Sequence, residues 1–140
     1  MKIQILKTTD INDCIDGYAP VFVENGKVTI DAPSNSISSI LMNNSIEEIP
    51  YLELNSFLQQ VTRLLRLGGE LIFSGIDINC LCRDVLNRSI TPETYNTVVY
   101  NRKSIYDSKE LADKIANAGL SINKLILKGS IYELHASRSV

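Results

Sequence analysis

The chain has no tryptophan, one histidine, three cysteines and seven glycines among its 140 residues. A mechanism that needs two histidines is therefore excluded. A zinc site is disfavoured, because Cys80 and Cys82 on one helix would lie about 200° apart around its axis. Together with Cys14 they form an odd set without the spacing of a disulfide framework. Phosphate-loop and dinucleotide-binding glycine motifs are absent, which disfavours kinase, NTPase and NAD-dependent activities.

Long apolar runs and an excess of one charge are missing too. No run approaches the roughly 18 residues of a membrane span, so we expect no transmembrane helix. The first ten residues, MKIQILKTTD, lack the apolar stretch of a signal peptide, which predicts a cytoplasmic protein. Fourteen basic and sixteen acidic side chains give a net charge of -2. This balance disfavours non-specific nucleic-acid binding, which needs a basic surface.

Hydrophobic residues, by contrast, make up 44% of the chain. This is enough to form a core without disulfides or metal. No repeat, low-complexity tract or linker interrupts the sequence, so we predict a single domain over residues 1–140.

The clearest element is an amphipathic helix over residues 51–66. Its apolar residues recur with helical spacing: Leu54, Phe57, Leu58, Val61, Leu64 and Leu65. Gly68 is expected to be its left-handed C-terminal cap. Strands are predicted before it at 37–42 and after it at 70–74. Two strands joined by such a helix form a right-handed crossover in a parallel sheet.

Two further helices are predicted over 77–87 and 107–119, with Asp77 and Asp107 as N-caps. The first is expected to carry Ile78, Leu81, Cys82, Val85 and Leu86 on one face. The second is expected to face inward with Leu111, Ala112, Ile115 and Ala118. Strands at 121–127 and 130–137 are close enough to form an antiparallel pair. At the other end, a strand at 2–6 precedes strands at 19–23 and 27–31, whose Asn25-Gly26 junction predicts a hairpin.

From about residue 31 onward, the order of these motifs resembles class I S-adenosylmethionine-dependent methyltransferases. The similar segments are 34–40 (SNSISSI), 45–50 (SIEEIP), 63–72 (RLLRLGGELI), 111–120 (LADKIANAGL) and 132–138 (YELHASR). The resemblance implies an α/β fold: a mostly parallel, twisted, Rossmann-like sheet in three layers, with an antiparallel C-terminal hairpin. Residues 32–140 would form the methyltransferase-like core with three helices, and residues 1–31 a remodelled, reduced N-terminal edge.

The family's cofactor motif has no counterpart here. The glycine-rich loop that lets the cofactor approach backbone amides is replaced by KTTDIN, and the first glycine is Gly17. The family's acidic residue that holds the ribose hydroxyls has no clear counterpart. Glu24 comes nearest to its position, but it falls in the predicted hairpin turn. Ser38, Glu48 and Leu67 also replace the family's usual Asp, His and Pro. The resemblance thus implies a degenerate methyltransferase-like domain without a working cofactor site, acting as a binding or assembly module. The alternative is an active small methyltransferase whose S-adenosylmethionine contacts are Asp10, Glu24 and Asn43.

Two other candidate sites stay open at this point. Tyr95, Tyr100, Arg102 and Tyr106 lie in the segment that shapes the substrate pocket in the family, and form either a ligand or partner surface or a solvated loop. Glu47 and Glu48 are either a general base or a solvated turn. His135 is expected to face solvent or a neighbour, and no residue is assigned a catalytic role.

The reduced N-terminal edge is expected to leave one face of the sheet uncovered, which predicts a partner. Loss of the family's first two helices would uncover one face of the strands at 2–6 and 37–42. Parallel sheets are normally covered on both faces. The apolar residues expected on that face are Ile3, Ile5, Ile37, Ile40 and Met42. We therefore expect a protein partner or a homo-oligomer.

Overall fold

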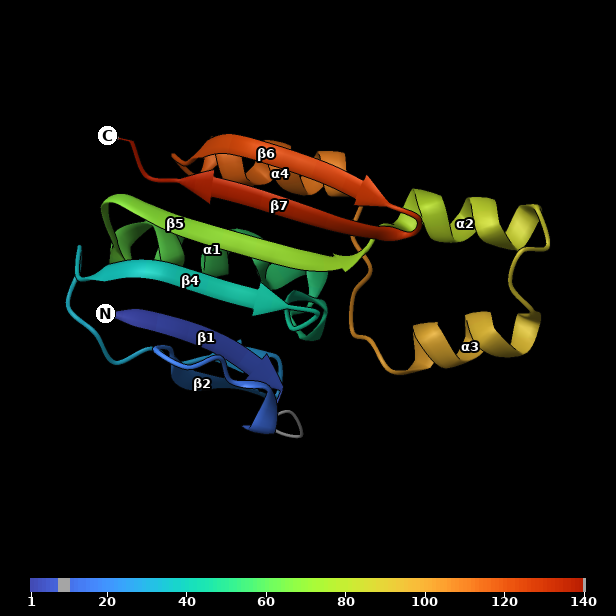
Figure 1. Cartoon of the computed structure of the whole chain (residues 1–140), viewed down its shortest axis with the longest axis horizontal. Coiled ribbons are helices and arrows are strands. Elements are labelled where there is room, and N and C mark those ends of the chain that lie inside the picture. The colour runs from blue at the N-terminus through green and yellow to red at the C-terminus, as the bar shows by residue number, and fades with distance from the viewer. Residues whose placement is uncertain (8–10, 140) are drawn as a thin grey trace.

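The computed structural model describes residues 1–7 and 11–139, which form one seven-stranded sheet with helices (Figure 1). The strand order across the sheet is β3-β2-β1-β4-β5-β7-β6. The strands are β1 (Lys2–Lys7), β2 (Ala19–Glu24), β3 (Lys27–Val28), β4 (Ile37–Asn43), β5 (Leu65–Ile76), β6 (Ser121–Lys128) and β7 (Ile131–Ser137). No helix of the described residues is both long and apolar enough to cross a membrane.

The centre of the sheet is parallel and its C-terminal side antiparallel, as predicted. β1 runs parallel to β2 and β4, and β4 runs parallel to β5. β7 runs antiparallel to both β5 and β6. The predicted N-terminal hairpin is present as well: β2 pairs with β3 across Asn25 and Gly26, whose φ angles of 53° and 75° suit a two-residue turn. The α/β fold with a reduced N-terminal edge is therefore confirmed.

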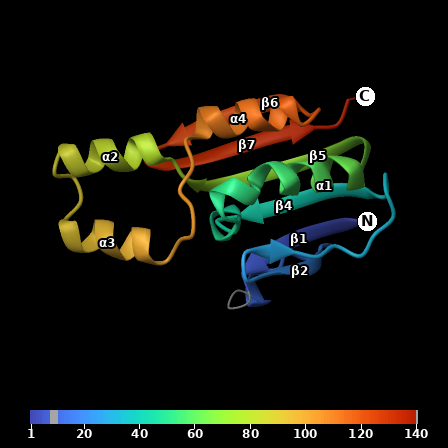
Figure 2. The same ribbon diagram turned by 180° about the vertical axis from the view of Figure 1, so that it is seen from behind.

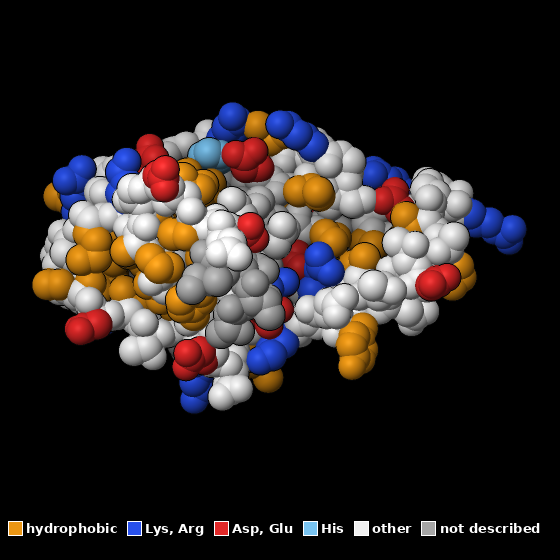
Figure 3. Space-filling view, turned by 60° about the horizontal axis from the view of Figure 1, so that its bottom comes forward, with side chains coloured by type: hydrophobic (Ala, Val, Ile, Leu, Met, Phe, Trp, Pro, Cys, Tyr) orange, Lys and Arg blue, Asp and Glu red, His pale blue; other side chains and the backbone are white. Residues whose placement is uncertain are grey.

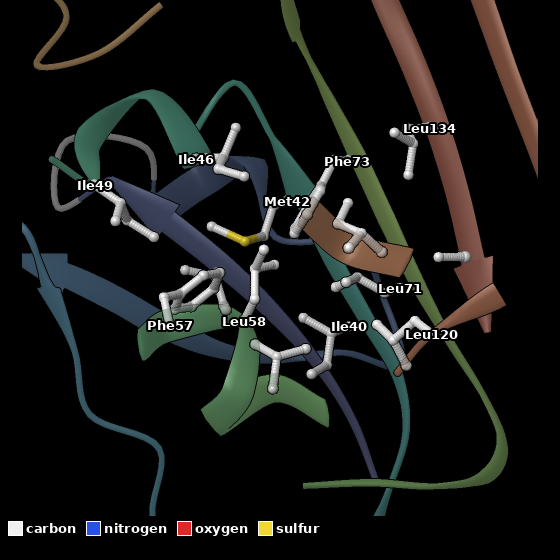
Figure 4. Close-up of a cluster of buried hydrophobic side chains, with 14 of the residues drawn as sticks. Ile40, Met42, Ile46, Ile49, Phe57, Leu58, Leu71, Phe73, Leu120 and Leu134 are labelled. Atoms are coloured by element: carbon white, nitrogen blue, oxygen red, sulfur yellow. The ribbon is translucent and has the colours of Figure 1, made fainter. Parts of the chain in front are cut away.

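Helices α1 (Leu54–Leu64) and α4 (Ser108–Asn117) lie on the same face of the sheet, the face turned to the viewer in Figure 2. The predicted apolar stripe of α1 is buried there, and Leu58 packs among Ile40, Met42 and Phe57 in the core (Figure 4). Leu111 and Ile115 of α4 are buried as predicted, whereas Ala112 and Ala118 are half-buried. Gly119 follows α4 with a φ of 102°, a conformation that favours glycine.

The prediction that the apolar residues of β1 and β4 lie on an uncovered face is wrong. Ile3, Ile5, Ile37, Ile40 and Met42 are all buried in the core, with exposed fractions of 0–2%. They point to the side that α1 covers, so the layer kept by the fold buries them.

The opposite side, called the front face here, is turned to the viewer in Figure 1. It carries Gln4, Ser39, Ile72 and His135, which alternate with core residues along their strands. In place of a helical layer, part of the β1–β2 connection folds back over this face, as the hydrogen bonds described below show.

Helices α2 (Ile78–Leu86) and α3 (Pro92–Tyr100) form an arm that extends past the strand ends (Figures 1 and 2). Asp77 caps α2 as predicted, its carboxylate accepting from the Cys80 N–H. Of the predicted apolar face of α2, only Leu81 is buried, together with Cys80, whereas Cys82 and Leu86 are exposed. Helix α3 has no counterpart among the three predicted helices.

Gly68 has the predicted left-handed conformation, but not as the cap of α1. The helix ends at Leu64, Leu65 is already extended, and Gly68 follows with a φ of 77° and its N–H bonded to the Arg138 carbonyl. A Cβ at this position would meet no atom within 4 Å. The conformational cost is therefore the only penalty for a side chain.

We expect Gly68→Ala to lower the free energy of unfolding by about 1 kcal/mol, measured by urea denaturation. Its control is Leu67→Ala, which truncates an exposed neighbouring side chain without changing a left-handed residue. Equal effects of the two substitutions would show that the backbone conformation is not the cause.

Candidate functional site

The ends of the parallel strands define the candidate site. β1, β2, β4 and β5 all run in one direction, so Lys7, Glu24, Asn43 and Ile76 mark one edge of the sheet. Open α/β sheets bind their ligands at this carboxyl edge. The glutamate and asparagine suggested as cofactor contacts thus lie at the edge where a ligand is expected.

The candidate cofactor contacts do not converge. Glu24 is exposed and pairs with Lys27 across the hairpin. Asn43 ends β4, and its Oδ1 accepts a hydrogen bond from Ser74 Oγ at 3.0 Å. β1 lies between their two strands, which separates them by two strand spacings, about 10 Å. Asp10, the third candidate, lies outside the described residues.

The connection from β1 to β2 is fastened to the front face. Its described part contains a short 3-10 helix, η1 (Ile11–Asp13), and no α-helix. The buried Gln4 side chain donates to the Asp13 carbonyl at 3.3 Å and accepts from the Ile15 N–H at 2.8 Å. Further on, the Tyr18 hydroxyl lies 3.1 Å from Ser39 Oγ. These bonds hold residues 13–18 against the sheet.

The glycines near this edge make close contacts with protein atoms. A Cβ on Gly26 would lie 2.8 Å from the Pro50 ring, so this glycine lets the hairpin turn pack against the β4–α1 connection. A Cβ on Gly75 would lie 2.7 Å from Glu47 Oε1 and 3.1 Å from the Tyr132 hydroxyl. Neither glycine is free to admit a cofactor. Both glycines are therefore engaged in the internal packing of this edge.

Glu47 is the most deeply buried charged group of this edge. Its side chain is fully buried, Oε1 accepts from the Ile76 N–H at 2.8 Å, and Oε2 forms an ion pair with Arg102. Its backbone carbonyl accepts from Lys103 and Ser104, both at 3.0 Å. The interpretation of Glu47 as part of a solvated turn is therefore wrong. Residues 102–104, which connect α3 back to the sheet, are thus bound to Glu47 in the segment that follows β4. We call these contacts of Glu47 with Arg102, Lys103 and Ser104 the Glu47 latch.

The electrostatics of the latch follow from its burial. Burial raises the pKa of the Glu47 carboxyl above its ordinary value of 4.5, and the hydrogen bond from Ile76 and the charge of Arg102 oppose this. Burial also raises the pKa of the nearby Tyr132 hydroxyl, with a smaller contribution from the Glu47 charge. Because Glu47 has no exposed surface, it cannot accept a proton from a substrate as a general base. Its neighbour Glu48 is half-buried and lies 3.6 Å from Lys7 Nζ.

The four residues of the predicted tyrosine and arginine surface are not brought together. Tyr106 is buried, and its hydroxyl donates to the Ile49 carbonyl at 2.7 Å. Arg102 belongs to the latch, Tyr95 is half-buried, and Tyr100 is 89% exposed. The prediction of one shared surface is thus wrong for Tyr106 and Arg102, because tertiary contacts bury them.

His135 is half-buried on the front face, with Nε2 2.8 Å from Glu133 Oε1. No group of three or more histidine, cysteine or acidic side chains suited to a metal ion occurs among the described residues.

Comparison with known proteins extends these observations. No protein-family model matches the chain, and no curated protein matches it. Solved structures do match. A possible histamine N-methyltransferase from Thermotoga maritima, described as S-adenosylmethionine-dependent, is 17% identical; the match covers 99% of this chain and 73% of that one, with a TM-score of 0.64. An S-adenosylmethionine-dependent methyltransferase from Mesorhizobium loti is 10% identical, with 98% and 80% covered and a TM-score of 0.67.

A third match comes from the complex between the Haloferax volcanii Trm112 methyltransferase activator and a methyltransferase. It is 8% identical, covers 91% of this chain and 64% of that one, and has a TM-score of 0.62. At these identities the likeness is one of fold. The fold of this chain is that of class I S-adenosylmethionine-dependent methyltransferases, and the chain is a methyltransferase-like domain.

Proposed function

We propose that this methyltransferase-like domain has no working S-adenosylmethionine site and acts as a binding or assembly module. The observation that carries the proposal is the β1–β2 connection. The first sixteen residues contain no glycine, and the described part of the connection is bonded to the sheet through Gln4 and Tyr18. A cofactor bound at backbone amides needs a close approach that these side chains and contacts oppose.

The remaining edge supports the same proposal. Glu24 is in a hairpin turn, and Asn43 is engaged by Ser74. Glu47, in the segment that follows β4, is buried and paired with Arg102. A domain that keeps its fold but holds these groups in internal contacts is suited to presenting a surface to another molecule.

Calorimetric titration with S-adenosylmethionine and S-adenosylhomocysteine tests the proposal. We expect no saturable heat with either ligand, and no shift of the unfolding midpoint in a parallel thermal scan. A ligand at about 100 times its dissociation constant would stabilise the fold by about 2.7 kcal/mol, which such a scan resolves.

A micromolar dissociation constant would contradict the proposal and favour the alternative, an active small methyltransferase with an atypical cofactor loop. Glu24→Ala and Asn43→Ala would then identify the contacts. Both residues end parallel strands at the carboxyl edge, and this position is what favours the alternative. Asp10→Ala would complete the set, and Glu53→Ala, on the α1 side of the fold, is a suitable control.

A further inference from the structure

The arm formed by α2 and α3 is poorly covered by the rest of the described chain. Its base is fixed, because the Asp77 N–H bonds to the Ser130 carbonyl and the Ile78 N–H bonds to the Tyr106 carbonyl. Beyond the base, α2 buries only Cys80 and Leu81, and α3 buries no residue at all. A nine-residue helix is marginally stable in water without packing. The arm therefore has the properties of an element that gains stability from a further contact.

The exposed side chains of the arm are large and apolar. Leu86 at the end of α2 is 82% exposed and Tyr100 at the end of α3 is 89% exposed, with Val85 and Val99 beside them at 39% and 38%. Figure 3 shows hydrophobic side chains projecting from the arm, at the right of the view, among acidic and basic ones. An open hollow of about 630 Å³ lies on the arm and is lined in part by Val99 and Tyr100. A second open hollow, of about 690 Å³, lies away from the arm beside β2.

The charges of the arm complement one another. Helix α2 exposes Arg83, whose side chain is 56% exposed, and Arg88 follows at the tip. The acidic Asp84 beside Arg83 is half-buried; it accepts from the Ser130 hydroxyl at the base of the arm and lies 3.9 Å from Arg83 Nε. Helix α3 begins with the exposed Glu93, which also borders the hollow. If two arms lay side by side with α2 of each copy facing α3 of the other, a basic side chain of one copy would lie opposite an acidic side chain of the other. The twofold symmetry would produce this contact twice. This complementarity selects a second copy of the chain as the occupant.

We propose that two copies of this chain associate through their α2–α3 arms in an antiparallel, twofold arrangement. Leu86 of each copy enters the hollow beside Tyr100 of the other, and Arg83 of each copy lies opposite Glu93 of the other. A closed twofold pairing buries both apolar ends at once and leaves no arm unpaired. The inference rests on the proposed function, since it names the partner of the assembly module.

Sedimentation velocity of the whole chain at micromolar concentration tests the pairing. We expect a dimer for the natural sequence and a monomer for Leu86→Glu/Tyr100→Glu, with unchanged far-UV circular dichroism. The loss of each of the two symmetric contacts is expected to weaken the dimer roughly tenfold or more. Leu52→Glu is the matched control: Leu52 is 92% exposed but lies outside the arm, so this variant should remain dimeric. A natural chain that sediments as a monomer overturns the proposal.

Charge reversal tests the geometry independently of folding. Arg83→Glu and Glu93→Arg are each expected to weaken the dimer, because each places like charges across the interface. The double variant Arg83→Glu/Glu93→Arg restores opposite charges and should recover the affinity. A double variant that is weaker than both single variants overturns the arm pairing.

The cofactor titration on the same sample separates this inference from the proposed function. A monomer that binds no S-adenosylmethionine overturns the arm pairing alone. A dimer that binds S-adenosylmethionine with micromolar affinity overturns the proposed loss of the cofactor site and leaves the arm pairing supported.

Discussion

Arg102→Met is expected to lower the free energy of unfolding by about 3–5 kcal/mol at neutral pH, the cost of leaving a buried charge without its partner. Glu47 is fully buried, and Arg102, which lies just after α3, forms an ion pair with its carboxylate. Urea denaturation measures the change. Lys103→Met is the control, because Lys103 is exposed and contributes its backbone N–H rather than its side chain to the latch.

The pH dependence identifies Glu47 as the source of this cost. Burial raises the pKa of Glu47 in the folded chain above 4.5, so the folded state binds more protons than the unfolded state in the window above that value. The stability contributed by this group is present below pH 4.5 and is lost as the pH rises through the folded pKa. Loss of the arginine charge should raise the pKa further.

The decrease of the free energy of unfolding with rising pH that Glu47 causes should therefore be steeper in Arg102→Met. It should be absent in Glu47→Gln/Arg102→Met, which has no carboxyl at this position. If the stability of Arg102→Met did not change with pH, or matched that of Lys103→Met, the latch would not hold a charged Glu47.

The elements with a strong local pattern could be predicted from the sequence. The apolar stripe of α1, the mostly apolar strand β4 and the Asn25-Gly26 turn each encode their structure within a few residues, and each was confirmed. The order of motifs also indicated the methyltransferase fold. Helix α3 was missed because it has no apolar stripe to detect, although its start was encoded: Thr91 accepts from the Thr94 N–H, and Pro92 occupies the first turn.

The candidate site was harder to predict because its contacts join distant segments. Nothing in the local sequence distinguishes Glu47 from Glu48, yet Glu47 is buried by Arg102 and Ile76, whereas Glu48 only approaches Lys7. Tyr106 resembled the other tyrosines of its segment, but its hydroxyl reaches the Ile49 carbonyl. For α2, helical spacing reveals the apolar side but not whether that side meets the sheet. Leu86 ends α2, which extends past the strand ends in Figure 1, and its side chain is 82% exposed.

Asp77→Ala is expected to lower the free energy of unfolding by about 2–4 kcal/mol, since two buried N–H groups would lose their acceptor. One carboxylate serves two helices: Oδ2 accepts from the Cys80 N–H in α2 at 2.9 Å, and Oδ1 accepts from the Ser108 N–H at the start of α4 at 2.8 Å. Asp107→Ala is the matched control, because it removes an exposed cap from α4 and should cost only about 1 kcal/mol.

The effect of Asp77 should also have the opposite pH dependence to that of Glu47. Burial acts to raise the pKa of the Asp77 carboxyl, but the hydrogen bonds from Ser108 and Cys80 outweigh it and hold the pKa below its ordinary value of 3.8. The stability that Asp77 contributes is therefore present above pH 3.8 and lost as the pH falls through the folded pKa. Asp77→Asn should lose this acid dependence along with one of the two hydrogen bonds. If Asp77→Ala were no less stable than Asp107→Ala, the arm and α4 would not depend on a shared carboxylate, and the arm would be held at its base by backbone bonds alone.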